Sequence, residues 1–403
     1  MVGLSLSLVL VVGVVSWRVL SDDPYVAPRP DRPVAASVDP TGAARALAAF
    51  VDAVAAGDPE AARAVAPADD PAAGDLLAAV ATNGRDLRVR DLSARYVDAT
   101  GPVAADGSWT ATADVAWRFA GFDRAPAQAE VQLGFRAVEG RVGLVAIGGG
   151  ETRSPLWLVG AVSVRRTPET LVLASGDTDA ARYARLATRA VPVVRRVVAD
   201  WRPRLVVEVP ASADDLDRAL GADAGTYAGI AAVTTSVDGS LAPDAPVHVM
   251  VNPAELGRLR PMGAQVVMSH EATHVATDAP TSGATPLWLL EGFADYVALR
   301  DVRLPVTTTA AQIIEQVRRD GPPAALPGTT EFDVRATHLG AVYESAWLAC
   351  EVLVERAGEA ALVTLYDDVA AGVPLERALR RGTGLTEAGL VEAWRDRLSD
   401  LAS

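Results

Sequence analysis

The chain has 403 residues, half of them hydrophobic, which is enough apolar material for buried cores in two or three domains. It carries 51 acidic and 37 basic residues, a formal net charge of −14, and this acidity argues against a nucleic acid as a partner. The single cysteine, Cys350, excludes an intramolecular disulfide, and its place in the apolar run Ala346–Val354 predicts a buried structural thiol.

The chain begins with Val2–Leu20, a run of almost uninterrupted apolar residues. Its length is at the short limit for a membrane helix and at the long limit for the core of a signal peptide. We expect residues 1–20 to be a membrane anchor, with a cleaved signal peptide as the alternative, because Val19-Leu20-Ser21 is a tolerable cleavage site. Either interpretation predicts extracytoplasmic domains, held at the cell membrane by a single pass or secreted.

A Pro-rich linker is expected over residues 21–42. The next segment, residues 43–175, is predicted to be a compact domain that begins with helices and continues with strands. The expected helices are Ala43–Ala56 and Pro59–Val65, with Asp58 as the N-cap of the second. The expected antiparallel strands lie within Leu87–Val97, Ser108–Phe119 and Ala129–Ile147, and the last of these segments turns at Glu139-Gly140.

Helices followed by a meander of strands make an α+β arrangement that resembles the NTF2-like cone fold. No diagnostic motif accompanies this resemblance. Domains of that kind often form pockets or interaction surfaces. The simpler interpretation, which we prefer at this point, is a spacer that holds the following domain away from the membrane.

Residues 176–403 are predicted to form a second domain with a sheet in its first half and helices in its second. A long helix is expected over Asp179–Trp201, a strand over Leu205–Val209, and a short helix over Ala213–Leu220 after Ser212 as N-cap. Two further strands are expected over Thr226–Val237 and Val247–Asn252. The later helices are predicted over the ranges 310–319, 338–356, 359–371 and 386–401.

The motif that carries chemistry is His270-Glu271-Ala272-Thr273-His274. The pattern H-E-x-x-H on a helix is typical of zinc proteases. Residues four apart lie on the same face of a helix, so His270 and His274 can present two imidazole nitrogens to one ion. Glu271 is rotated away from that face, which suits a general base that acts on a metal-activated water. The chain has four histidines, so a chance occurrence of this pattern is improbable.

Glu291 is the expected third ligand. It lies inside the apolar run Leu287–Leu299, which follows a loop containing Pro280 and Pro286. A hydrolytic zinc site takes three protein ligands and one open position, and two histidines with one glutamate are a known set. The sequence therefore predicts a helix, a loop and a helix, with one Zn²⁺ held between them. His248 is an alternative fourth ligand, but we prefer to interpret it as a strand histidine without chemistry.

These residues give the chain a resemblance to the gluzincin metallopeptidases, above all to the short bacterial peptidase MA-like domains. The resemblance covers about residues 182–401 and is strongest over Val266–Arg300, where H-E-x-x-H is followed by Glu291-Gly292-Phe293-Ala294-Asp295-Tyr296. It implies a thermolysin-like fold, with His270, His274 and Glu291 as zinc ligands and Glu271 as catalytic base. It also implies that Asp295 orients a zinc histidine; the alternative is a solvated helix carboxylate.

The same resemblance implies two further features. An edge strand, here Val247–Asn252 or its neighbour Tyr227–Thr235, would bind the backbone of the substrate; the alternative is an ordinary core strand. A tyrosine or histidine after the third ligand, here Tyr343 or His338, would stabilise the oxyanion of the tetrahedral intermediate. We prefer Tyr343, which lies near the start of a predicted helix, although a core or rim tyrosine is the alternative.

The function predicted from the sequence is zinc-dependent hydrolysis of peptide bonds in a peptide or protein substrate. Two other hypotheses stay open. The chain could be a membrane-tethered binding protein whose metallopeptidase domain does not cut, although all the key residues are present. It could also be a zinc hydrolase that acts on a bond other than the peptide bond.

Overall fold

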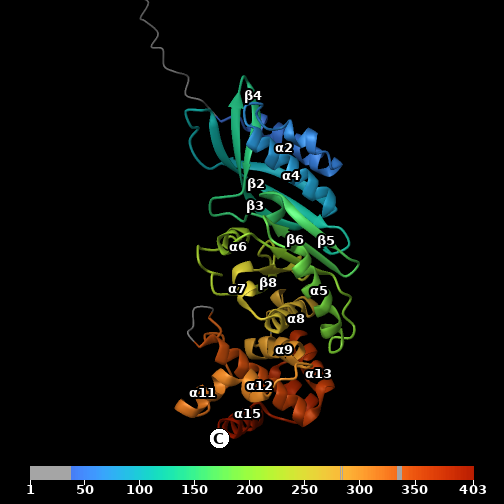
Figure 1. Ribbon diagram of the computed structural model, residues 1–403, viewed down its shortest axis with the longest axis vertical. Helices are drawn as coiled ribbons and strands as arrows, with labels where there is room; N and C mark the ends of the chain where they lie inside the picture. The colour runs from blue at the N-terminus through green and yellow to red at the C-terminus, as the bar shows by residue number, and fades with distance from the viewer. Residues whose placement is uncertain (1–37, 282, 284, 334–337) are drawn as a thin grey trace, which may run out of the picture. The chain divides into compact units, whose positions relative to one another are not determined.

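The computed structural model describes residues 38–403, apart from positions 282, 284 and 334–337. The expected anchor over residues 1–20 lies outside the described residues, and so does the linker up to residue 37; both stay predictions. Within the described part of the chain, no helix is both long and apolar enough to cross a bilayer. The described residues form helices and two β-sheets, which is an α+β fold (Figure 1).

Three helices open the described chain, and each begins at an Asp-Pro pair. They are α2 (Pro40–Ala56), α3 (Pro59–Arg63) and α4 (Pro71–Asp86). The aspartate before each proline accepts a hydrogen bond from a backbone N–H of the first turn, and the proline has no N–H that could be left unpaired. The predicted cap at Asp58 is confirmed. The linker is shorter than expected, because Thr41 and Gly42 belong to α2.

The first sheet is an antiparallel meander in the order β1-β2-β3-β4. Its strands are β1 (Val89–Ala99), β2 (Ser108–Phe119), β3 (Ala127–Val138) and β4 (Arg141–Ile147). More and less buried residues alternate along β2, because successive side chains of a strand point to opposite faces. The buried set, which includes Trp109 and Phe119, packs with Leu77 of α4 in one hydrophobic core. The predicted turn at Glu139-Gly140 joins β3 to β4.

The second sheet has five strands in the order β5-β6-β7-β9-β8. They are β5 (Val162–Arg166), β6 (Thr170–Ser175), β7 (Leu205–Val209), β9 (Val247–Val251) and β8 (Ala232–Ser236). The strands β6, β7 and β9 are parallel, whereas β5 and β8 are antiparallel to their neighbours, so the sheet is mixed. The predicted first domain extends to residue 175. In the structure β5 and β6 belong instead to the second sheet, because β6 pairs in parallel with β7.

The second sheet is covered on both faces. Leu205 and Val207 point to one face and pack with α5 (Ala180–Arg195) and α8 (Pro261–Ala276) in the larger core. Leu171, Leu173 and Val206 point to the opposite face and pack in the core of the first sheet. Residues 38–403 therefore form one compact unit. The segment that the sequence analysis interpreted as a spacer covers one face of the sheet next to the histidine motif.

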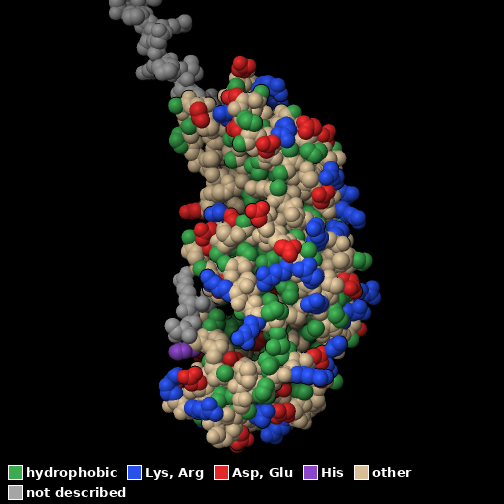
Figure 2. Space-filling view, viewed as in Figure 1, with side chains coloured by type: hydrophobic (Ala, Val, Ile, Leu, Met, Phe, Trp, Pro, Cys, Tyr) green, Lys and Arg blue, Asp and Glu red, His purple; other side chains and the backbone are tan. Residues whose placement is uncertain are grey.

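The remaining helices complete the second half of the chain. They are α6 (Ala213–Leu220), α7 (Pro253–Arg258), α9 (Leu287–Leu299), α10 (Val306–Thr309), α11 (Ala311–Asp320), α12 (Leu339–Ala357), α13 (Glu359–Ala370), α14 (Leu375–Thr383) and α15 (Glu387–Ala402). Cys350 lies in α12 and is fully buried, as predicted, and burial raises the pKa of its thiol. Acidic and basic side chains are interspersed over the face shown in Figure 2. The net negative charge is therefore not gathered into one patch on that face.

Candidate metal centre

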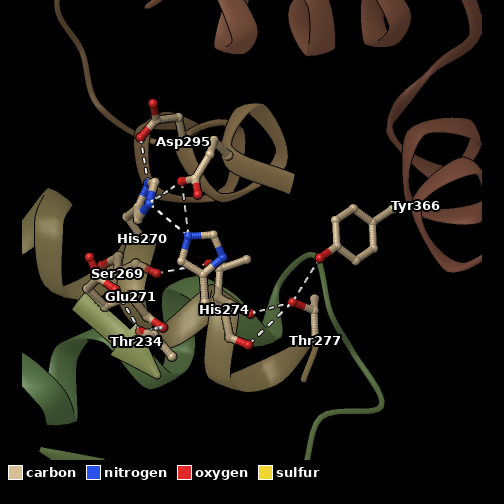
Figure 3. Close-up of polar contacts among 10 residues, drawn as sticks. Thr234, Ser269, His270, Glu271, His274, Thr277, Asp295 and Tyr366 are labelled. Atoms are coloured by element: carbon tan, nitrogen blue, oxygen red, sulfur yellow. Dashed lines mark hydrogen bonds and ion pairs between the residues drawn. The ribbon is translucent and has the colours of Figure 1, made fainter. Parts of the chain in front are cut away.

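Helix α8 carries the histidine motif, and its bounds follow from the residues at its two ends. Pro261 stands in the first turn, where its missing N–H breaks no helical hydrogen bond. After the last helical residue, Ala276, comes Asp278 with a φ of 50°, a left-handed conformation that is incompatible with a continuing helix. His270 and His274 lie one turn apart on α8 and point towards α9 (Figure 3).

Three side-chain atoms converge between α8 and α9. The Nε2 atoms of His270 and His274 lie 2.9 Å apart, and Glu291 Oε2 lies 3.1 Å from the first and 3.2 Å from the second. These three residues form the one group of metal-ligating side chains found among the described residues. Ligands that each lie about 2.0–2.1 Å from a tetrahedral zinc would be separated by about 3.3 Å. The observed separations are close to that value, so the three residues could hold such an ion.

Asp295 lies one turn after Glu291 on α9. Its Oδ1 is 2.7 Å from His270 Nδ1, on the side of the ring that faces away from the cluster. Asp295 therefore accepts the Nδ1–H proton and leaves the Nε2 lone pair directed at the cluster, which is how carboxylates orient metal-binding histidines. The Nδ1 atom of His274 is buried and has no such partner among the described residues.

The electrostatics of the cluster favour a cation. His270, His274 and Glu271 are all less than one tenth exposed, which is rare for ionisable groups that lack a compensating charge. Burial alone would raise the pKa of Glu291, but His274 and His270 outweigh it and hold that pKa well below its usual range. Burial would likewise lower the pKa of His270, yet Asp295 and Glu291 raise it. Glu291 thus contacts both imidazole rings, and Asp295 contacts that of His270.

Glu271 follows His270 in α8 but is not part of the cluster. Its carboxylate Oε2 accepts a hydrogen bond of 2.6 Å from the hydroxyl of Thr234, which belongs to β8 (Figure 3). The motif thus directs two side chains towards α9 and the third towards the second sheet. Glu271 is therefore a neighbour of His270 in the helix but not one of the three clustered residues.

The other residues considered in the sequence analysis lie in three different environments. The ring of Tyr343 is 6.0 Å from that of His270, measured between centroids, so α12 brings this tyrosine to the centre. His338 is exposed at the start of α12. The ring nitrogens of His248 are bonded to Glu208 and Asp123, at 2.6 and 3.0 Å, so neither is free to serve as a fourth ligand.

Two neighbours of the site had no signal in the sequence. Thr234 reaches Glu271 from a strand that is remote in the chain, and threonines are common in strands without any special role. Tyr366 of α13 is buried, and its hydroxyl donates to Thr277 Oγ1 at 3.1 Å, just beyond the end of α8. Burial, followed by the nearby Glu291, raises the pKa of Tyr366 to about 12. A local pattern cannot reveal such contacts, since they depend on the fold.

Gly292, next to Glu291, allows α9 and α12 to pack closely. A Cβ atom at this position would lie 2.4 Å from the carbonyl oxygen of Ala346 and 3.0 Å from Cys350 Sγ. We expect Gly292→Ala to force the two helices apart and to lower the free energy of unfolding by about 1–3 kcal/mol. Zinc affinity should fall as well, because Glu291 moves with the helix. Chemical denaturation and zinc titration measure the two effects.

Gly263→Ala is the matched control, since Gly263 is also a helical glycine but its Cβ would have only an ordinary contact at 3.7 Å, with Leu259. That variant should be neutral or slightly more stable, because alanine favours a helix by up to about 1 kcal/mol over glycine. Equal stability of the two variants would contradict the packing argument.

The sequence was compared with models of protein families and with curated proteins. No protein-family model matches the sequence, and no curated protein matches it either.

Proposed function

We propose that the chain is a zinc-dependent hydrolase that cuts peptide bonds. The observation that carries this proposal is the convergence of His270 Nε2, His274 Nε2 and Glu291 Oε2, with Glu271 next to His270 in the same helix. Two imidazoles and one carboxylate are a ligand set of hydrolytic zinc sites, and the spacing in α8 is that of zinc proteases. The resemblance to gluzincin metallopeptidases in the same stretch supports the same activity.

Each residue of the site has its own role in the proposed mechanism. Zinc, when bound, supplies a Lewis acid that lowers the pKa of water and polarises a carbonyl group. Asp295 holds His270 in the tautomer that presents Nε2 to the centre. Glu271 acts as general base, taking a proton from the attacking water and delivering it to the leaving amine. A peptide-bond nitrogen is a poor leaving group unless it is protonated. Delivery of the proton to the amine is therefore as necessary as its removal from the water.

The second sheet favours an extended peptide as substrate. Of the two candidate strands, β9 is paired on both sides, by β7 and β8, whereas β8 stands at the end of the sheet order. An extended peptide can add to an open sheet edge through main-chain hydrogen bonds alone. We therefore assign substrate binding to β8, whose Thr234 contacts the proposed base. A complex with a peptide-like inhibitor that made no main-chain contact to β8 would refute this assignment.

Tyr343 is the proposed donor to the oxyanion. Burial, together with the charges of Glu291, Glu271 and Asp295, raises the pKa of its phenol, so the proton stays on the oxygen at neutral pH. We expect Tyr343→Phe to lower kcat by about 10²-fold while leaving the zinc content unchanged, because one donor to an oxyanion contributes about that factor.

The matched control for Tyr343→Phe is Tyr183→Phe, which removes the hydroxyl of another buried tyrosine, in α5. Its kcat should equal that of the wild type. If Tyr343→Phe also kept the wild-type kcat, Tyr343 would have no part in the mechanism.

The experiment that tests the proposal combines elemental analysis with digestion of a broad peptide library. The expected result is one zinc per chain and cleavage that a chelator stops and added zinc restores. Zinc without cleavage of any peptide would favour a binding protein or a hydrolase for another bond. A purified, folded chain that bound no metal would refute the proposal.

A further inference from the structure

Thr234 lies where the second sheet meets the histidine helix. It pairs with Val249 across β8 and β9, and side chains of successive strand residues alternate between the two faces. Ala232, two residues before it, belongs to the core that contains α8, whereas Val233 packs against the separate cluster around Leu216 and Met250. Thr234 is therefore directed towards α8, and its neighbour Thr235 points the other way.

The hydroxyl of Thr234 donates to Glu271 Oε2 at 2.6 Å and lies 3.1 Å from the backbone oxygen of the same residue. A hydrogen bond to an ionised carboxylate is short and about twice as strong as one between neutral groups. Glutamate has several rotatable bonds, while a β-branched residue on a strand has a restricted χ1 angle. The restricted side chain of Thr234 thus fixes the position of one carboxylate oxygen of the more flexible Glu271 side chain.

We propose that Thr234 is a positioning residue that anchors the carboxylate of Glu271. This inference rests on the proposed function and adds a second role to β8. The main chain of the strand would bind the substrate, and a side chain of the same strand would hold the base. The scissile bond and the carboxylate are then placed by one element, so that a peptide added to β8 meets Glu271 already in position. Such preorganisation acts on the chemical step rather than on binding.

The test compares three variants of the full chain. Thr234→Val keeps the shape and the main-chain groups of β8 but removes the donor, so kcat should fall about 10- to 100-fold while KM changes by less than about threefold. Thr234→Ser restores the donor and should recover kcat to within about threefold of the wild type. Thr112→Val, the same change in strand β2 of the first sheet, should leave both constants unchanged. Zinc content should be the same in all three, since Thr234 contacts no ligand atom of the cluster.

A crystal structure of Thr234→Val supplies a readout that does not depend on activity. The Glu271 carboxylate should leave its place next to β8. Three results would overturn the inference: a wild-type kcat in Thr234→Val, a loss that Thr234→Ser does not recover, or a Glu271 side chain that stays in place without the hydroxyl. If the wild-type protein hydrolyses no peptide, the proposed function fails, and the position of Glu271 in the variant crystal still decides whether Thr234 anchors it.

Discussion

Glu271→Gln is expected to bind zinc as the wild type does and to lose nearly all hydrolytic activity. Glutamine has the same shape, Thr234 can still donate to its side-chain oxygen, and Glu271 is not one of the three ligands. An amide cannot take up a proton at neutral pH, however, so the reaction loses its base, which contributes about 10²–10⁴-fold. Elemental analysis gives the zinc content, and kcat on a peptide from the library digest gives the activity.

His274→Ala should differ from Glu271→Gln by losing the metal as well as the activity. The substitution removes one of three protein ligands and leaves a cavity beside His270 Nε2 and Glu291 Oε2. The contrast between the two variants separates a ligand from a base, because both side chains are buried in the same helix turn.

The matched control for Glu271→Gln is Glu315→Gln, an equivalent change at an exposed position of α11. It should retain both zinc and activity. Hydrolysis at the wild-type rate in Glu271→Gln would remove Glu271 from the mechanism, and full zinc binding in His274→Ala would remove His274 from the ligand set.

Elements with strong local signals were predicted well from the sequence. The bounds of α9, β2, β7 and α6 match the predicted ranges, because apolar periodicity and capping residues such as Ser212 mark their ends. The helix α4 was missed although Asp70-Pro71 repeats the start signal that identified Pro59. The strand β8 is shorter than the predicted 226–237, because the Asp217 carboxylate accepts from the N–H groups of Gly225 and Tyr227 and draws the first part of this segment into a turn.

In the candidate site, too, the residues that lie close together in the sequence were predicted, whereas contacts between distant parts of the chain were not. The positions of His270 and His274 follow from helix geometry, and Asp295 was expected from a resemblance within one short stretch. Thr234 and Asp123 reach their histidine or glutamate partners across large sequence separations. Thr234 lies in a strand at the end of the second sheet, and Asp123 follows a strand of the first sheet. The partner of each depends on the order in which the strands pair and on how the two sheets pack, and neither is encoded in a short stretch of sequence.

His248 lies in strand β9, as predicted, and is the centre of a buried triad of ionisable side chains. Its Nδ1 lies 2.6 Å from Glu208 Oε1, its Nε2 lies 3.0 Å from Asp123 Oδ1, and its ring stacks on Phe119. All three ionisable residues are at most 5% exposed. An imidazole can donate from both nitrogens only when it is protonated. The triad joins the end of β2 in the first sheet to β7 and β9 in the second, where the two sheets share a core.

The charge state of His248 makes stability depend on pH. Burial would lower its pKa, but Asp123 and Glu208 outweigh burial and raise the pKa to about 9. The unfolded chain has the ordinary value of about 6.5. The protonated form is therefore favoured by folding, and its contribution is fully present below about pH 6.5 and is lost as the pH rises to about 9. The difference between the folded and unfolded pKa values of His248 corresponds to roughly 3 kcal/mol in the free energy of unfolding.

We expect His248→Leu to lower the free energy of unfolding at pH 7 by about 3–5 kcal/mol, because it leaves two buried carboxylates without a counter-charge. The wild type should lose stability relative to this variant between about pH 6.5 and 9, so that the gap between the two narrows. Urea denaturation across that range measures the gap. His338→Ala, at an exposed histidine, should change stability by no more than about 0.5 kcal/mol. A gap that stayed constant with pH would show that His248 is not protonated in the folded chain, and one of the two carboxyl groups would then have to carry the proton and donate it to the ring nitrogen that it faces.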